Sequence, residues 1–324
     1  MREHVFIGID TGKHSTKVLM EHRGKTYTLL FRTKMQETYD LGVEVQPSSY
    51  KIDFEGRQFL LGDMSSESQS DFNLSKETLI HQVSIYTAIC EIMRKANIYF
   101  HNVQLHVAVN VPINVYKSKT QKESFKRFIE NNGKTIYFRV NDCQYNFNLT
   151  DVTICFEGMG LIYSNSSEVK NSSSTVIDIG GLNTTYCVFN GIQPDFSSMT
   201  VSHAGINILK AKLEQALVQK YNRNVSATDL ELLIQRGYIS YMGQIEEDSK
   251  KIIAQVKQAH FEQIINYAKQ HNYTFNQDFI YFVGGGALLL QKEISEQFPN
   301  AKIVINPQFA NVKSFLEIVK VKYA

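Results

Sequence analysis

The chain has 324 residues, of which 43% are hydrophobic and 20% are charged, a composition typical of globular proteins. This length is too great for one ordinary core and suits two α/β domains. Basic and acidic residues nearly balance, at 34 and 32, which excludes a protein-wide basic surface that holds DNA by counterion release.

The N-terminal residues predict a β-hairpin with an aspartate at its turn. An apolar strand enters Gly8-Ile9-Asp10-Thr11-Gly12, and a second strand leaves through Ser15-Thr16-Lys17-Val18-Leu19. Glycine permits the tight turn between them. The chain enters this strand without a signal peptide, and no apolar run is long enough to span a bilayer. We therefore expect a cytoplasmic protein with no membrane partner.

The next part of the chain predicts the rest of a first domain. After a strand at 26–31, residues 33–73 are polar and irregular and predict a small insertion with short strands near 49–54 and 57–62. Apolar spacing then predicts a helix at 77–96, a strand at 103–109 stopped by Pro112, a helix at 121–131 and three strands that lead to Phe156.

Two sets of side chains in the chain have mainly structural interpretations. The basic run is either a binding patch or, as is commoner for such runs, a solvated helix face: Lys117, Lys119, Lys122, Lys126 and Arg127. The cysteines lack a CxxC spacing and predict small buried side chains in a reducing compartment: Cys90, Cys143, Cys155 and Cys187.

A carboxylate follows the last strand of the first domain. Glu157 lies in Ile154-Cys155-Phe156-Glu157-Gly158-Met159-Gly160, at a strand end beside glycines. In a cleft, such a residue can polarise a water for in-line attack on a phosphate. The alternative is a glutamate that begins a helix near the positive end of the helix dipole. Spacing alone leaves both interpretations open.

The hairpin motif is repeated 168 residues further along the chain. A polar stretch at 164–174 precedes it and predicts a boundary between a first domain at 1–170 and a second at 171–310. The repeat reads Val176-Ile177-Asp178-Ile179-Gly180-Gly181, followed by Thr184-Thr185-Tyr186-Cys187-Val188. Superposing the two copies places Asp178 on Asp10, Gly180 on Gly12 and Thr184 on Thr16.

The second domain continues through helices to a glycine triplet. Helices are expected at 205–220, 227–236 and 246–271, followed by a strand at 279–283. Gly284-Gly285-Gly286 then opens a helix at 287–298, where bare backbone lets an adenine or ribose approach and a helix N-terminus offers N–H donors. Taken alone, this pattern is also that of a tight strand-to-helix turn. A last helix within 311–324 is expected to return to the first domain.

Together these segments predict a phosphate clamp. Two aspartate–glycine hairpins that face one cleft suit a polyphosphate, because glycine lets backbone N–H groups approach it closely. Lys17 would offset phosphate charge, while Asp10 and Asp178 would hold the waters of a bound Mg²⁺. One hairpin alone fits a glycine turn with a solvated aspartate equally well, but two matched copies favour the clamp.

The motifs in this order resemble the phosphate 1, phosphate 2 and adenosine motifs of the actin, heat-shock chaperone and sugar kinase ATPase superfamily. The chain most closely resembles the actin-like proteins of the ParM type, which segregate plasmids, and the match covers nearly the whole length, including Phe309-Ala310-Asn311. The resemblance implies an α/β fold of two ribonuclease-H-like domains that flank a nucleotide cleft. Phe156, where ParM-like proteins often have proline, and Lys313-Ser314 depart from the pattern.

The resemblance also implies the site residues. ATP, or alternatively GTP, would be bound with Mg²⁺ by three segments: Asp10, Thr11, Gly12, Ser15, Thr16 and Lys17 in the first loop; Asp178, Gly180, Gly181 and Thr184 in the second, with Gly205 opening the next helix; and Gly284, Gly285 and Gly286 in the adenosine pocket. Glu157 would activate the attacking water, so that catalysis would rest on Glu157, Asp10 and Asp178.

The activity implied is ATP hydrolysis coupled to dynamic filaments that move plasmid DNA. Expected partners are further copies of the chain and a DNA-binding adaptor protein, with plasmid DNA contacted only indirectly. Alternatives on the same fold are a small-molecule kinase, an exopolyphosphatase-like phosphohydrolase and a static nucleotide-dependent scaffold. Kinases of this superfamily are usually longer, and exopolyphosphatase relatives favour a serine-rich first loop, which Thr11-Gly12-Lys13-His14 does not supply.

Overall fold

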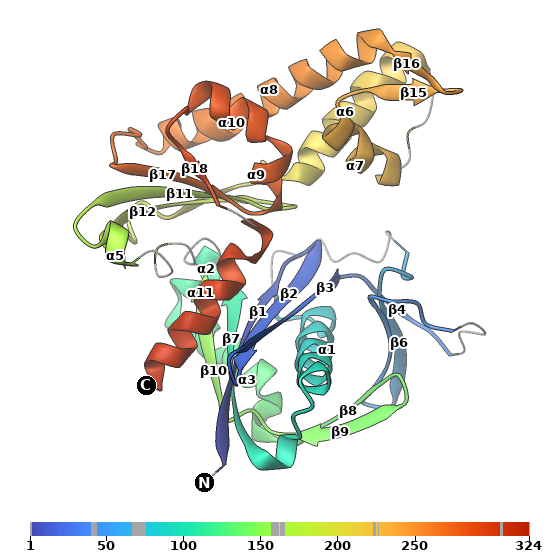
Figure 1. The fold of residues 1–324 in the computed structure, drawn as a ribbon, viewed down its shortest axis with the longest axis vertical. Coiled ribbons are helices and arrows are strands. Elements are labelled where there is room, and N and C mark those ends of the chain that lie inside the picture. Colours follow the sequence, from blue (N-terminus) through green and yellow to red (C-terminus); the bar gives the residue numbers. More distant parts are fainter. Residues whose placement is uncertain are drawn as a thin grey trace. The chain divides into compact units, whose positions relative to one another are not determined.

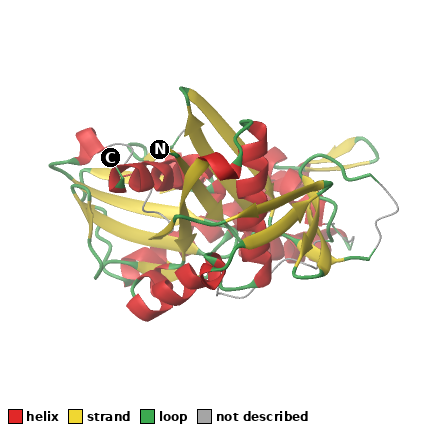
Figure 2. Cartoon of the chain, turned by 90° about the horizontal axis from the view of Figure 1, so that it is seen from below, coloured by secondary structure: helices red, strands yellow, loops and turns green. Residues whose placement is uncertain are grey.

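The chain folds into two compact units (Figure 1). Unit 1 comprises Met1–Ser164 and Phe309–Ala324, and unit 2 comprises Asn165–Gln308. The computed structural model describes residues 2–39, 44–66, 76–156, 162, 166–222, 225, 227–304 and 307–323. Each unit combines strands with helices, which confirms the predicted α/β class (Figure 2). Within these described ranges, no helix is long and apolar enough to cross a membrane.

Unit 1 is built on a five-stranded sheet that contains the first predicted hairpin. In spatial order its strands are β10 (Asp151–Phe156), β7 (Val103–Val111), β1 (Glu3–Thr11), β2 (Ser15–His22) and β3 (Lys25–Arg32). The three N-terminal strands pair antiparallel, whereas β7 runs parallel to both β1 and β10. Most side chains of β1 and β7 are buried, as expected for strands in a sheet covered on both faces.

Two helices cover the faces of this sheet: α1 (Leu79–Lys95) and α11 (Pro307–Lys322). α1 packs in the cluster that contains Val18, and α11 packs in the cluster that contains Leu19. Because successive residues of a strand point to opposite faces, the two helices lie on opposite sides of the sheet. α11 approaches β1 so closely that a Cβ at Gly8 would lie 2.4 Å from the Val312 carbonyl oxygen.

A second five-stranded sheet packs against α1 (Figure 1). In spatial order its strands are β4 (Met35–Glu37), β6 (Arg57–Gly62), β5 (Ser49–Phe54), β8 (Ile136–Val140) and β9 (Cys143–Phe147). The strands predicted near 49–54 and 57–62 are confirmed as β5 and β6, and β8 and β9 join them from much later in the chain. α1 therefore lies between two sheets, which explains why every side chain from Ile80 to Met93 is buried.

One cysteine prediction is wrong. Cys90, Cys155 and Cys187 are buried, but Cys143 is exposed. Cys143 is the first residue of β9, the edge strand of the second sheet, so a strand, β8, pairs with it on one side only.

Short helices precede and follow β7 in the chain. η2 (Phe100–Asn102) precedes it, and three helices follow it: α2 (Ile113–Tyr116), α3 (Lys119–Ile129) and η3 (Asn131–Gly133). The side chain of Ser118 caps α3 by accepting the Gln121 N–H, which satisfies one of the free donors at the helix start. α3 buries Phe125 and Ile129, so its basic residues lie on the more exposed sides of the helix.

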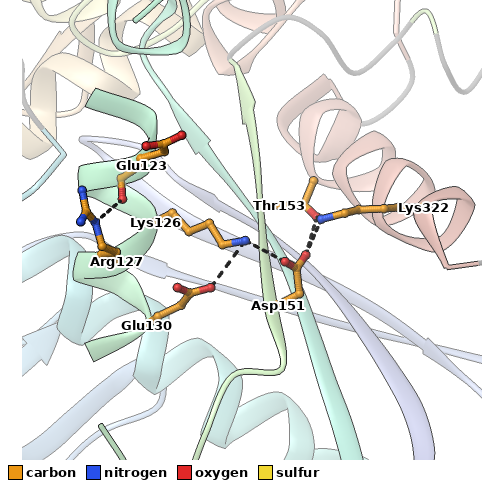
Figure 3. Close-up of polar contacts among 7 residues, drawn as sticks. All are labelled: Glu123, Lys126, Arg127, Glu130, Asp151, Thr153 and Lys322. Carbon is orange, nitrogen blue, oxygen red and sulfur yellow. Dashed lines mark hydrogen bonds and ion pairs between the residues drawn. The ribbon is translucent and has the colours of Figure 1, made fainter. Parts of the chain in front are cut away.

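The start of β10 is held by lysines from two helices (Figure 3). Lys126 of α3 places its Nζ 2.8 Å from Asp151 Oδ1, and Lys322 of α11 places its Nζ 2.6 Å from Asp151 Oδ2. Burial alone would raise the pKa of Asp151, but hydrogen bonds from the two lysines and Tyr323 hold it well below its ordinary value. Part of the basic run therefore ties α3 to the sheet, and the same carboxylate anchors the end of α11.

Unit 2 repeats the strand plan of unit 1. Its sheet contains the antiparallel pair β11 (Ser173–Ile179) and β12 (Thr184–Asn190), then β17 (Phe279–Val283) parallel to β11 and β18 (Lys302–Ile303) parallel to β17. Two short strands extend the edge at β12: β13 (Gln193–Pro194) and β14 (Thr200–Ser202). In unit 1, β1, β2, β7 and β10 have the corresponding order and directions, so the repeat predicted from the two hairpins extends to their neighbouring strands.

The helices and remaining hairpin of unit 2 are α5 (Ser166–Val169), α6 (Ile206–Tyr221), α7 (Ala227–Arg236), β15 (Ile239–Tyr241), β16 (Gln244–Glu246), α8 (Glu247–Gln270), α9 (Gly285–Leu289) and α10 (Gln291–Gln297). Leu209 and Leu213 of α6 and Phe261 and Ile264 of α8 belong to its buried core. The single helix predicted at 287–298 is wrong, because Leu290 is fully buried with a non-helical backbone (φ −108°, ψ 17°) that separates α9 from α10.

A buried histidine predicts pH-dependent stability of unit 2. His260 of α8 is fully buried, and its ring nitrogens have no hydrogen-bond partner in the described part of the chain. Burial, with a smaller effect of Lys212, lowers its pKa to about 4. In the unfolded chain this histidine takes up a proton near pH 6.5, whereas in the folded chain it stays neutral until about pH 4. The free energy of unfolding therefore decreases as pH falls from 6.5 towards 4, by up to about 3 kcal/mol.

We expect His260→Leu to reduce this slope. Denaturant unfolding between pH 4 and 8 should give a free energy of unfolding that varies less with pH in the variant than in the wild type. His203→Leu, at an exposed histidine of the same unit, is the matched control and should keep the wild-type slope. Equal slopes for wild type and His260→Leu would contradict this account.

Candidate functional site

The first predicted loop joins β1 to β2, with its aspartate and lysine in direct contact. The strand register pairs Asp10 with Lys17 and Thr11 with Thr16. Lys17 Nζ lies 3.2 Å from Asp10 Oδ2, and the carboxylate is buried. The amide of Gly12 donates to the Ser15 carbonyl at 3.1 Å, which closes the turn.

The second predicted loop has the same geometry. Asp178 pairs with Thr185 and Ile179 with Thr184, and the amide of Gly180 donates to the Asn183 carbonyl at 2.9 Å. A Cβ at Gly12 would lie 3.0 Å from the Ser15 carbonyl oxygen, and a Cβ at Gly180 would lie 3.0 Å from the Asn183 carbonyl oxygen. Each of these positions is offset by 168 residues from its counterpart, so the sequence repeat is also a repeat of backbone geometry.

The threonines that follow the two turns have internal partners. The Thr16 hydroxyl shares a hydrogen bond of 2.9 Å with the Thr33 hydroxyl, and the Thr184 hydroxyl donates to the Ala204 carbonyl at 2.8 Å. Both threonine side chains are fully buried. Their hydroxyls hold each hairpin to the segment beside it.

Gly205 packs against the second loop at the start of α6. It is the N-cap of this helix, and a Cβ there would lie 2.3 Å from the Leu182 carbonyl carbon. The first N–H groups of the helix point at the loop: Ile206 donates to the Gly180 carbonyl at 3.0 Å and Asn207 to the Gly181 carbonyl at 2.8 Å. The carbonyls of the loop are thus satisfied by α6.

Two amides of this loop are suited to an anion. Gly181 and Leu182 are half-buried, and no hydrogen bond from their N–H groups to another described residue exists. Adjacent backbone donors of this kind form concave sites for phosphate oxygens. The fold therefore presents N–H groups at the position where the sequence predicts the second phosphate loop.

The glycine triplet lies against the second loop. Gly284 has φ +84°, and a Cβ there would lie 2.4 Å from Asp178 Oδ1. A Cβ at Gly286 would lie 2.3 Å from the Ile179 Cγ2 atom, whereas at Gly285 no heavy atom lies within 4 Å. Gly284 and Gly286 are thus required by packing, while Gly285 leaves open space. The structure brings the predicted adenosine segment and the second loop together within unit 2.

Sequence reasoning missed Asn110, the polar residue near the end of β7. Its Nδ2 donates to Asp10 Oδ1 at 2.8 Å, and its Oδ1 accepts the Thr11 N–H at 3.1 Å. The sequence does contain one indication of this role: Asn110 is the single polar residue in the otherwise apolar end of the strand, two residues before Pro112. An unpaired amide at that depth would cost free energy, so it must have partners.

The contacts described above do not test three predicted features of the site: the role of Glu157, the phosphate clamp and the metal site. Glu157 is outside the described residues. The first and second loops belong to different units, so the phosphate clamp between them stays a prediction, as does the metal site on Asp10 and Asp178. Within the described ranges, no group of three or more histidine, cysteine, aspartate or glutamate side chains is arranged to hold a metal ion.

Comparisons with known proteins identify the family. Residues 8–160 match the family model of the N-terminal domain of actin like proteins, and residues 169–318 match the C-terminal model of the plasmid segregation protein ParM. The chain belongs to the actin-like proteins of the ParM type. A comparison with curated proteins finds no match.

Solved structures agree with the family models. An Alp12 filament structure is 26% identical, with a TM-score of 0.74 and coverage of 99% of this chain and 100% of that chain. A 15-stranded ParM filament from Clostridium botulinum is 19% identical (TM-score 0.79, coverage 98% and 99%), and the archaeal actin homolog Ta0583 in complex with ADP is 18% identical (TM-score 0.76, coverage 98% and 99%). The predicted ParM-type family and actin-like fold are confirmed.

The glycine triplet of this ParM-type chain yields a test of packing. We expect Gly284→Ala and Gly286→Ala each to lower the free energy of unfolding by roughly 2 kcal/mol or more, because each methyl group meets atoms of the second loop. Gly285→Ala is the matched control and should leave stability unchanged or raise it by up to about 1 kcal/mol. Denaturant unfolding measures all three, and a loss at Gly285 equal to that at Gly286 would contradict the assignment.

Proposed function

We propose that this protein binds ATP and Mg²⁺ between its two aspartate–glycine loops, assembles into filaments and disassembles them after hydrolysing the ATP. The observation that carries the proposal is the repeat of one turn geometry, with its aspartate in the same register, in both units of a ParM-type chain. A single such turn needs no ligand. Two of them on one chain suit a polyphosphate, which offers oxygens to donors from both sides.

Charge compensation would come mainly from the first loop. Lys17 is half-buried and already directed at the site aspartate, so its ammonium group is held near the place proposed for the phosphates. The second loop has Thr185 at the corresponding position and offers the N–H groups of Gly181 and Leu182 instead. In this arrangement unit 1 supplies the positively charged Lys17 side chain, and unit 2 supplies backbone N–H donors.

The aspartates suit a magnesium ion held through water. Both oxygens of Asp10 already accept a hydrogen bond, one from Asn110 and one from Lys17. Their remaining lone pairs can accept hydrogen bonds from metal-bound waters, which Mg²⁺ usually retains. When bound, the ion would neutralise charge on the transferred phosphate.

Glu157 is proposed as the base that orients and deprotonates the attacking water, a role that rests on the resemblance to ParM-type proteins. The chain reaches this residue directly from β10, which is parallel to β7 in the central sheet of unit 1. Asp10 and Asp178 are proposed to contribute to catalysis only through the metal and its waters.

The cargo of the proposed filament is plasmid DNA, attached through a DNA-binding adaptor in the cytoplasm. The near balance of 34 basic and 32 acidic residues favours an adaptor over direct DNA contact. Support for self-association comes from the Alp12 and Clostridium botulinum relatives, whose structures are filaments. Support for the nucleotide comes from Ta0583, whose structure holds ADP.

Sedimentation and light scattering test the assembly. We expect the protein to pellet with ATP and Mg²⁺ and to return to the supernatant once the ATP is consumed. Gly285→Ala should remain folded but lose ATP-dependent pelleting, because its methyl group fills the open space proposed for the adenosine. Filaments that persist after ATP exhaustion would favour a static scaffold, and a sugar that stimulates ATP consumption would favour a kinase. Failure to pellet with any nucleotide, across salt and Mg²⁺ concentrations, would contradict the proposal.

Glu157→Ala tests the hydrolytic step. We expect nucleotide binding to be retained and phosphate release to fall by about 100-fold or more, as is typical when a general base is removed. Filaments of this variant should outlast those of the wild type in a sedimentation time course. Glu123→Ala, at an exposed glutamate of α3, is the matched control and should turn over normally. Normal phosphate release by Glu157→Ala would remove Glu157 from its proposed role.

A further inference from the structure

The buried amide of Asn110 holds both the side chain and the backbone of the first loop. Asn110 is 0% exposed near the end of β7. Its Nδ2 donates to Asp10 Oδ1 at 2.8 Å, and its Oδ1 accepts the N–H of Thr11, the next residue, at 3.1 Å. One side chain thus fixes the carboxylate relative to the strand end that carries it.

The orientation of this amide is determined by its partners. The Thr11 N–H can only donate, so it must face the amide oxygen, and the amide nitrogen is then directed at Asp10. Lys17 contacts the other carboxylate oxygen at 3.2 Å. The Asp10 carboxylate is therefore held from two sides and has little freedom to rotate.

The second loop lacks this amide. β1 and β7 pair Ile9 with Val109, so Asn110 is the residue beside Asp10 in the register. β11 and β17 pair Asp178 with Val283, which places a valine at the corresponding position. Asp178 instead lies against the backbone of Gly284, where a Cβ would come within 2.4 Å of its Oδ1. Two aspartates in the same register thus have different neighbours on the parallel strand.

We propose that Asn110 is a positioning residue that acts through Asp10: it orients the carboxylate so that its free lone pairs accept the waters of the nucleotide-bound Mg²⁺. This inference rests on the proposed function. A carboxylate fixed in advance loses no rotational freedom when the hydrated ion arrives, so removing the amide should weaken the metal-dependent part of nucleotide binding. Binding of the nucleotide without metal does not use this orientation and should change little.

The test compares the binding of a fluorescent ATP analogue in excess Mg²⁺ and in EDTA. We expect Mg²⁺ to tighten binding to the wild type, and Asn110→Val, which introduces the residue found at the corresponding position of unit 2, to reduce that gain by roughly 10-fold. The Kd in EDTA should stay within about 3-fold of the wild-type value. Asn114→Ala, at an exposed asparagine of α2, is the control and should keep the full gain.

A double-mutant cycle separates positioning from simple structural support. Because Asn110 acts through Asp10, Asn110→Val should cause no further loss of the Mg²⁺ gain in an Asp10→Ala background. A structural role alone would weaken binding in that background as well, with and without metal. If Asn110→Val does not fold, as judged by its unfolding transition, Asn110→Ser is used in the same cycle, with the same result expected.

The outcomes distinguish this inference from the function on which it rests. A wild-type chain that binds the analogue neither with nor without Mg²⁺ overturns the proposed function and this inference with it. A wild type that shows the Mg²⁺ gain, together with an Asn110→Val variant that retains it fully, overturns the inference alone. So does an additive loss in the double variant.

Discussion

The tight turn after each aspartate is the constraint on which both units depend. In each hairpin a glycine N–H closes the turn onto a carbonyl three residues later, and a side chain at the glycine would crowd that same carbonyl. This closure sets the strand register that places Asp10 opposite Lys17 and Asp178 opposite Thr185. The parallel strand on the other side of each aspartate, β7 in unit 1 and β17 in unit 2, then determines which residue lies beside it there: Asn110 beside Asp10 and Val283 beside Asp178. A register shift of one residue would turn the aspartates to the opposite face of the sheet.

The two units use one backbone plan with different chemistry. Unit 1 places an ammonium group and a buried amide beside its aspartate, whereas unit 2 places Gly284, the residue before α9, beside its aspartate. In the glycine triplet, Gly284 and Gly286 are required by packing, whereas a Cβ at Gly285 would meet no heavy atom within 4 Å.

Features encoded by local pattern could be predicted, and features that depend on distant pairing could not. The hairpins, α1 and β7 follow from glycine positions and apolar spacing within a few residues. Asn110 contacts Asp10 across 100 residues of sequence, and β8 joins the sheet of β5 from a similarly distant part of the chain, so neither has a local signature. Cys143 is exposed on the edge strand β9, and the break between α9 and α10 falls at Leu290, whose side chain is fully buried, so neither feature follows from local apolar spacing.

The close packing of α11 on Gly8 has a consequence for biosynthesis. The apolar face of the sheet that includes Leu19, Ala108 and Cys155 is covered by α11, which follows the whole of unit 2 in the chain. During translation this face stays uncovered until α11 leaves the ribosome, although β1 is made before unit 2. Unit 2 is continuous in sequence and can close its core earlier. The strand that carries Asp10 is therefore synthesised before the whole of unit 2 but is enclosed on this face only after it.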